Sequence, residues 1–258
     1  QGFGRAEQEY VPNTAVLRTR LFDEQGQGLE ITDFAPRFMR RGRMFHPVQI
    51  VRRLRVLSGA PRIRVLLRPR FDYGAVAPRI TQGSHHVRYV GPDQVLRLTT
   101  TAPISYVLQE QPFILSETTS LLLGPDESLT EGVEELAEAW ERETVSYWRE
   151  WTRRLALPLE WQEAVIRAAV TLKLCVEAGV DMLLHTYFCD TITEDGVVQG
   201  IIAENKSGRA ALLARMVVDG SGDGDVAYRA GAPFWQIVAD EAPRLNDALM
   251  YRIQFGAT

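Results

Sequence analysis

Two different sequence patterns meet in Thr171-Leu172-Lys173-Leu174-Cys175-Val176-Glu177-Ala178-Gly179, a stretch whose apolar residues have helical spacing. Before it, apolar residues first alternate with polar ones and then recur every three or four positions. After it, short apolar runs are separated by Gly and Asp. The change predicts two unrelated pieces joined near residue 175, and the join falls inside one helix.

Upstream, residues 11–123 show the period of two that is typical of strands, with Gly, Pro and Asp turns between them and no helical segment. We therefore expect an antiparallel β-sandwich over residues 1–125. The segment 58–61 is predicted to join two long strands as a hairpin, with Ile50, Leu54 and Val56 facing Ile63, Val65 and Leu67. The predicted strands are residues 15–22, 49–57, 62–70, 86–90, 95–100, 105–109 and 120–123.

Residues 126–175 have helical periodicity. Ser128 and Glu131 fit a capping box, which predicts a helix over residues 130–154. Its tryptophans suit either a sugar-stacking platform or a helix core, and their spacing favours the core. The apolar stripe of this helix is Val133, Leu136, Ala137, Trp140, Tyr147, Trp148 and Trp151. A second helix after Pro158 is predicted to bury Trp161, Val165, Ala168, Leu172 and Cys175.

Residues 176–258 are predicted to form a small α/β meander whose parallel sheet has lost its neighbours. Strands are expected at residues 180–194, 197–204 and around Ala211, before a buried apolar run at residues 216–218. That run ends in a turn rich in Gly and Asp, residues 219–225. Glycines let a backbone approach a phosphate or ribityl chain closely. Without a full Gly-x-Gly-x-x-Gly pattern, a turn that binds nothing is the simpler interpretation, and no glutamate completes a calcium loop.

Composition and charge exclude several classes of function. The net charge of -4 predicts no nucleic-acid binding. Arginines crowd residues 37–79 and alternate there with apolar residues, which predicts a wetted sheet face, with a surface for a polyanion or an acidic partner as the alternative. No apolar run is long enough to span a bilayer and no signal segment opens the chain, so we expect a cytoplasmic protein without a membrane partner. Cys175 and Cys189 are predicted to be reduced thiols, and the four histidines predict no metal site. The carboxylates of residues 134–141 are expected on a solvated helix face.

The first piece resembles the N-terminal β domain of bacterial glycoside hydrolase family 15, the glucoamylase and trehalase-like proteins. The resemblance rests on separated motifs in the family's order, such as Tyr147-Trp148-Arg149-Glu150-Trp151. It implies a β-supersandwich and linker helices that lead to a catalytic barrel. The catalytic glutamates belong to that barrel, so no residue of this sequence inherits their role. The motifs are residues 10–20, 31–36, 50–54, 69–74, 147–151 and 168–174.

The second piece, residues 176–258, resembles a fragment of an FAD-dependent oxidoreductase. Val217-Val218-Asp219-Gly220-Ser221-Gly222-Asp223-Gly224-Asp225 carries the resemblance, with further motifs at residues 177–186, 195–200, 205–209, 230–234 and 249–253. The resemblance implies that Ser221, Gly222, Asp223, Gly224 and Asp225 bind the cofactor. The sequence contains no Gly-x-Gly-x-x-Gly cradle for the FAD pyrophosphate, which predicts weak flavin binding.

Three hypotheses follow. In the first, the chain is chimeric or truncated, and its larger part is a glucoamylase-like or trehalase-like domain without its barrel. In the second, that β domain binds carbohydrate as a module. In the third, the chain is an FAD-dependent oxidoreductase whose Ser-Gly-Asp-Gly-Asp turn contacts flavin. Strands left uncovered in residues 176–258 are expected to allow self-association and to make this piece the less stable one.

Overall fold

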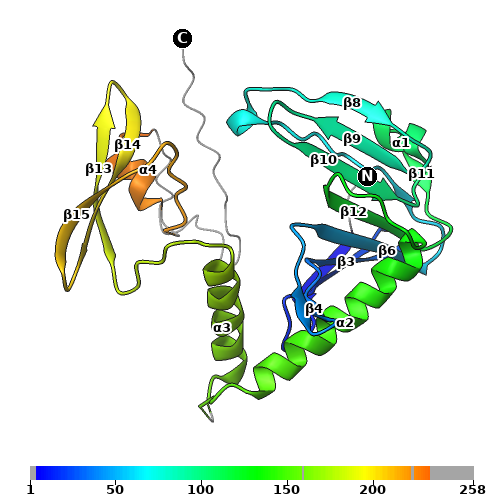
Figure 1. Cartoon of the computed structure of the whole chain (residues 1–258), viewed down its shortest axis with the longest axis horizontal. Coiled ribbons are helices and arrows are strands. Elements are labelled where there is room, and N and C mark those ends of the chain that lie inside the picture. Colours follow the sequence, from blue (N-terminus) through cyan, green and yellow to red (C-terminus); the bar gives the residue numbers. More distant parts are fainter. Residues whose placement is uncertain (1–3, 159, 222–223, 233–258) are drawn as a thin grey trace. The chain divides into compact units, whose positions relative to one another are not determined.

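The computed structural model describes residues 4–158, 160–221 and 224–232 (Figure 1). The chain divides into two compact units, Gln1–Glu177 and Ala178–Thr258. Each unit is described by itself below.

The first unit is built on one eight-stranded sheet in the order β1-β2-β3-β6-β12-β10-β9-β8. Every neighbouring pair in it is antiparallel. Its strands are β1 (Arg5–Tyr10), β2 (Leu17–Phe22), β3 (Gly28–Phe34), β6 (Ile50–Ser58), β8 (Arg79–Gln82), β9 (His86–Val90), β10 (Val95–Thr100) and β12 (Thr119–Pro125). The small pairs are β4 (Phe38–Arg40) with β5 (Arg43–Phe45), and β7 (Arg62–Ile63) with β11 (Phe113–Ile114).

One face of the sheet carries an apolar core. Leu54, Leu98 and Leu121 project from three neighbouring strands into it. The chain between residues 61 and 76 crosses this face, and the short helix α1 (Ile104–Leu108) adds the buried Val107. Irregular segments therefore cover a face that a second large sheet would cover in a sandwich.

The opposite face is covered by helix α2 (Val133–Arg153), which contacts β12 and β4 (Figure 1). Leu136, Ala137 and Trp140 pack there against Val51 of β6 and Leu122 of β12. Beside this apolar patch the same face is charged, because alternate residues of β2, β3 and β6 are arginine and glutamate. The sheet face that α2 covers thus has an apolar part and a charged part.

Helix α3 (Gln162–Glu177) packs on the C-terminal half of α2 through a third core, in which Trp148 meets Ile166 and Val170. Its last turn is held by Glu177, which pairs with Arg37 and with Lys173. Glu177 therefore belongs structurally to the first unit. The buried stripe of α3 is Ile166 and Val170, not the predicted one: Trp161 lies just before the helix, 80% exposed, and Leu172 is exposed.

The predicted sandwich is not confirmed, since the described residues form one large sheet. The hairpin over residues 58–61 was wrong: β6 pairs with β3 and β12, and only two residues of the predicted strand 62–70 are in a strand. The inward set was nevertheless mostly right, because Leu54, Val56, Ile63, Val65 and Leu67 share one core, while Ile50 is exposed. The alternation of apolar and polar residues indicates which side chains are buried, whether or not the backbone forms a strand pair.

Two local predictions in this unit were also wrong. Residues 105–109 were predicted as a strand, but residues 105–108 belong to α1 and Gln109 is its C-cap, because so short a segment does not distinguish the two structures. The predicted capping box does not cap α2, whose N-cap is Gly132 without a side-chain bond. The stripe of α2 was confirmed, with Leu136, Ala137, Trp140 and Trp148 buried.

The second unit contains an antiparallel meander, β13 (Tyr187–Glu194), β14 (Val197–Asn205) and β15 (Gly208–Leu213), and helix α4 (Asp225–Arg229). Gly200 lies where β14 passes closest to β15: a Cβ there would stand 2.2 Å from the Leu212 carbonyl oxygen. The three successive strands were predicted correctly, but the parallel sheet was not, since both described strand pairs are antiparallel hairpins. Residues 180–186 are not in a strand, and the run at residues 216–218 is not buried, since Val218 is 85% exposed.

Candidate functional site

The glycine-rich turn connects the end of the meander to α4 and contains the predicted cofactor residues. Ser221, Gly224 and Asp225 are described, whereas Gly222 and Asp223 lie outside the described residues. Gly224 has φ +73° and is the residue before α4, a conformation that glycine adopts without strain. The turn is therefore a tight entry into a helix.

Asp219, which was not among the predicted site residues, organises this turn. One carboxylate oxygen accepts hydrogen bonds from the backbone N–H and the hydroxyl of Ser221, at 3.0 and 2.7 Å. The other accepts the backbone N–H of Ala227 at 2.9 Å. The Ser221 hydroxyl oxygen in turn accepts the N–H of Asp225 at 2.9 Å. One carboxylate thus fixes both the turn and the first residues of α4.

These bonds set the ionisation of Asp219. Partial burial favours the neutral acid, but the bonds from Ser221, Ala227 and Val226 outweigh it and lower the pKa of the carboxyl. Asp219 is therefore an anion at neutral pH. Its signal in the sequence is an Asp two residues before a Ser and just ahead of a helix, a spacing typical of Asx turns.

The fit of this turn to FAD is partial. A Cβ at Gly220 or Gly224 would meet no atom within 4 Å, so another molecule can approach the backbone there. The hydroxyl of Ser221 and the carboxylate of Asp219 are already engaged with each other. Every described strand pair is antiparallel, so the described residues include no parallel βαβ cradle for a pyrophosphate. The turn suits one edge of a flavin nucleotide and not its phosphates.

Other candidate residues do not converge. Within the described ranges no three His, Cys, Asp or Glu side chains are grouped so as to hold a metal ion. Both cysteines are free and half-buried. His86 has a pKa below its usual value, because burial and the nearby Arg97 disfavour its protonation. No described helix is long and apolar enough to cross a membrane.

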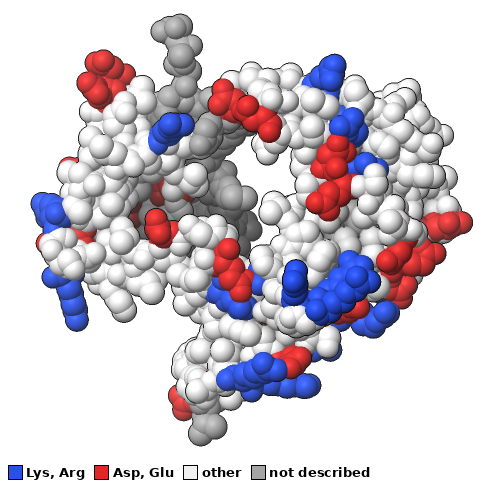
Figure 2. Space-filling model, in the orientation of Figure 1, with Lys and Arg blue, Asp and Glu red and all other residues white. Residues whose placement is uncertain are grey.

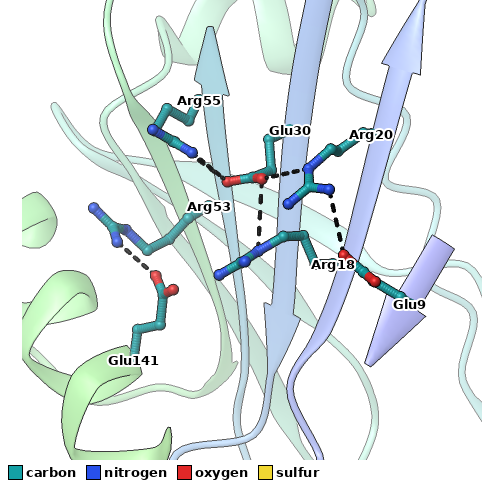
Figure 3. Close-up of polar contacts among 7 residues, drawn as sticks. All are labelled: Glu9, Arg18, Arg20, Glu30, Arg53, Arg55 and Glu141. Carbon is teal, nitrogen blue, oxygen red and sulfur yellow. Dashed lines mark hydrogen bonds and ion pairs between the residues drawn. The ribbon is translucent and has the colours of Figure 1, made fainter. Parts of the chain in front are cut away.

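A second polar site lies between the sheet and α2, and the residue pattern did not predict it (Figure 3). Glu30 of β3, with a side chain only 5% exposed, pairs with Arg55 at 2.7 Å, Arg20 at 3.0 Å and Arg18 at 3.6 Å. Its pKa is lowered: burial acts to raise it, but the bonds from Arg55 and Arg20 prevail. Glu30 therefore stays ionised inside the fold.

The neighbouring Arg53 connects this sheet face to the helix. Its guanidinium binds Glu134 at 2.5 Å and Glu141 at 2.6 Å, both on α2. The expectation that these carboxylates lie on a solvated face was wrong for Glu134 and Glu141. They recur seven positions apart, so they share one side of α2 and face the arginine strand.

A cavity of about 240 Å³ opens within this network, lined by Glu30, Glu141 and three of the arginines. Its walls are Arg18, Glu30, Thr32, Arg53, Arg55, Thr118 and Glu141. The site is polar throughout, unlike the apolar clefts that hold most cofactors.

Comparisons with known proteins address the second unit and part of the first. Residues 108–253 match the family model described as FAD dependent oxidoreductase. The match includes α2 and α3, so one family model covers residues on both sides of residue 175. No curated protein and no solved structure matches the chain, and nothing in these comparisons supports the resemblance to glycoside hydrolase family 15. Since the match covers more than half of the sequence, the chain belongs to the FAD dependent oxidoreductase family.

Proposed function

We propose that the chain serves FAD-dependent oxidation or reduction and that its turn from Ser221 to Asp225 lies against the flavin nucleotide. The observation that carries the proposal is the hydrogen bonding of Asp219. Its carboxylate accepts three hydrogen bonds, two from Ser221 and one from Ala227 of α4, and the backbone at Gly220 and Gly224 is open to another molecule. The family match includes this segment.

The residues of the turn have distinct tasks under this proposal. The open glycine backbone permits close approach of the nucleotide. Asp225 is exposed and its carboxylate forms no hydrogen bond within the described part of the chain, so it is free to accept one from a ribityl hydroxyl. Bound FAD would supply the electron-transferring ring. The protein residues would hold and orient it.

Titration of FAD with the full chain, followed by the anisotropy of flavin fluorescence, tests this proposal. We expect saturable binding, and we expect Asp225→Asn to weaken it about tenfold, since hydrogen bonds to a charged group contribute roughly 1.5–3 kcal/mol. Asp219→Asn should also weaken binding, because the loosened turn must then be ordered by the ligand.

Asp195→Asn is the matched control. Asp195 is an exposed aspartate in the β13–β14 turn of the same unit, at φ +50°, where asparagine is tolerated. It should bind FAD as the unaltered chain does. Unchanged anisotropy at every protein concentration, or equal affinities for the Asp225 and Asp195 variants, would refute the flavin contact.

A carbohydrate module in residues 1–125 remains a proposal resting on resemblance alone. Residues 1–125 contain no tryptophan, and Trp140 and Trp148 of the following helix α2 are buried, so these side chains offer no face for sugar stacking. Calorimetry with maltose and trehalose tests it directly, and no heat of binding would exclude the module.

A further inference from the structure

In the cavity between α2 and the sheet, hydrogen-bond donors outnumber the acceptors that remain unbonded. Arg53 donates to Glu134 and Glu141. Arg55 donates to Glu30, and Arg20 donates to Glu30 and Glu9. The carboxylates of the network are thus already served by three of its four arginines.

Arg18 is the exception. It projects from β2 toward the space between Glu30 and Glu141 (Figure 3). Its Nε lies 3.6 Å from Glu30, close enough for an ion pair but too far for a hydrogen bond. Among the described residues, that buried nitrogen has no hydrogen-bond partner. A buried N–H that lacks a hydrogen bond is destabilising, so the site favours an added acceptor.

Other donors face the same space. Thr32 is buried on the cavity wall and Thr118 is half-buried there, and within the described ranges neither side-chain hydroxyl is hydrogen-bonded. Guanidinium and hydroxyl groups converge, while the acceptors around them are largely occupied. A ligand that fits this surplus is rich in acceptor oxygens and small enough for about 240 Å³.

We propose that this cavity binds a small oxyanion, a phosphate or a carboxylate, with Arg18 as its principal ligand. The guanidinium presents parallel N–H groups that match two oxygens of such an anion. Thr32 and Thr118 donate from the wall. The residues of this site belong to the first unit, and the proposal does not rest on the flavin turn.

The charges of the network also set the expected affinity. Four arginines face four glutamates here: Arg18, Arg20, Arg53 and Arg55 against Glu9, Glu30, Glu134 and Glu141. The anion is therefore bound by hydrogen-bond donors that have no acceptor in the protein, and not by a net positive charge. We expect weaker binding than in a site whose arginines have no paired carboxylates. A cation finds no free carboxylate pair in this cavity.

Isothermal titration of the full chain with inorganic phosphate, and separately with succinate, tests the proposal. At least one should give saturable heat, and the tighter one identifies the chemistry of the anion. Arg18→Gln should weaken that binding tenfold or more. Arg79→Gln is the matched control, because Arg79 is an exposed arginine of the same sheet, at the edge strand β8. It should bind as the unaltered chain does.

A spectroscopic measurement keeps the test independent of folding. In ¹⁵N spectra the Nε–H signal of Arg18, identified by its loss in Arg18→Lys, should shift on saturation with the anion. The proposal is overturned if neither anion gives saturable heat, if Arg18→Gln binds as well as Arg79→Gln, or if the Arg18 signal does not move while the anion binds.

Discussion

Glu30 is a carboxylate held almost out of solvent by arginines, and its charge determines how the sheet responds to acid. Its lowered pKa means that the folded state releases the proton more readily than the unfolded chain, whose carboxyl has the ordinary value of 4.5. The stabilisation is fully present above about that pH. It is lost as the pH falls through the lower pKa of the folded state.

We predict that Glu30→Gln lowers the free energy of unfolding at pH 7 by about 2 kcal/mol. This is below the range for a fully buried ion pair, because Arg20 and Arg55 stay partly exposed. The difference between variant and unaltered chain should shrink in acid. Urea unfolding at pH 7 and at pH 3 measures both values.

Glu24→Gln provides the control, since Glu24 is exposed in the turn between β2 and β3 and forms no ion pair with the described residues. It should leave unfolding unchanged at both pH values. A Glu30 variant that is equally destabilised at pH 7 and pH 3 would contradict the electrostatic account.

The charged residues of the sheet show what a sequence pattern can and cannot predict. The alternation of arginines in β6 correctly separated Leu54 from Arg53 and Arg55. It did not predict that the arginine face is covered by a helix, because the partners Glu134 and Glu141 are more than 80 residues away in sequence. In the glycine-rich turn the residue types were evident. The central role of Asp219 depends on bond geometry that no spacing fixes.

At the scale of elements, α2 joins all parts of the first unit. Its N-terminal half packs on the sheet, and its C-terminal half packs on α3 around Trp148, which is 1% exposed. The guanidinium of Arg37 also lies 5.5 Å from the Trp148 ring. Trp148 is therefore the main apolar contact between the two helices.

We predict that Trp148→Ala destabilises the first unit by about 3–5 kcal/mol, because it opens a cavity in a core that cannot collapse around it. Trp161→Ala is the comparison, since that tryptophan is 80% exposed and should change stability by less than about 0.5 kcal/mol. Thermal unfolding by circular dichroism measures both. Similar losses in the two variants would show that Trp148 is not a core residue.

The helices and the strands of the meander were predictable because the apolar residues of each recur with one spacing over a long stretch. The sandwich was not predictable, since period two says which side chains are buried and not which strand is the neighbour. The buried stripe of α3 was misplaced by about one position. Several of its faces carry apolar residues, so contact with α2 and not hydrophobicity selects the buried one.

At the scale of the whole molecule, the two compact units meet in sequence at residues 177 and 178. Residues 178–186 contain no helix or strand, and Gly179 has φ +71°. The apolar side chains Leu183 and Leu184 in this segment are exposed. Such a segment is a good protease substrate.

We predict that thermolysin, which cuts beside large apolar residues, cleaves within residues 178–186 and leaves a stable fragment that ends near Glu177. Trypsin is the internal control, because this segment contains no Lys or Arg. Mass spectrometry of the early fragments identifies the sites. First cuts inside residues 4–158, with the C-terminal piece intact, would contradict the prediction.

The contact between Arg37 and Glu177 joins residues 140 positions apart, and this separation affects synthesis of the chain. Arg37 is buried beneath Trp148, and its charge is matched by a carboxylate from the last residue of α3. A nascent chain that ends at residue 174 has every strand of the sheet but not this counter-ion. The ion pair that neutralises Arg37 therefore forms only after Glu177 has left the ribosome, which makes it one of the last contacts of the first unit to become available during synthesis.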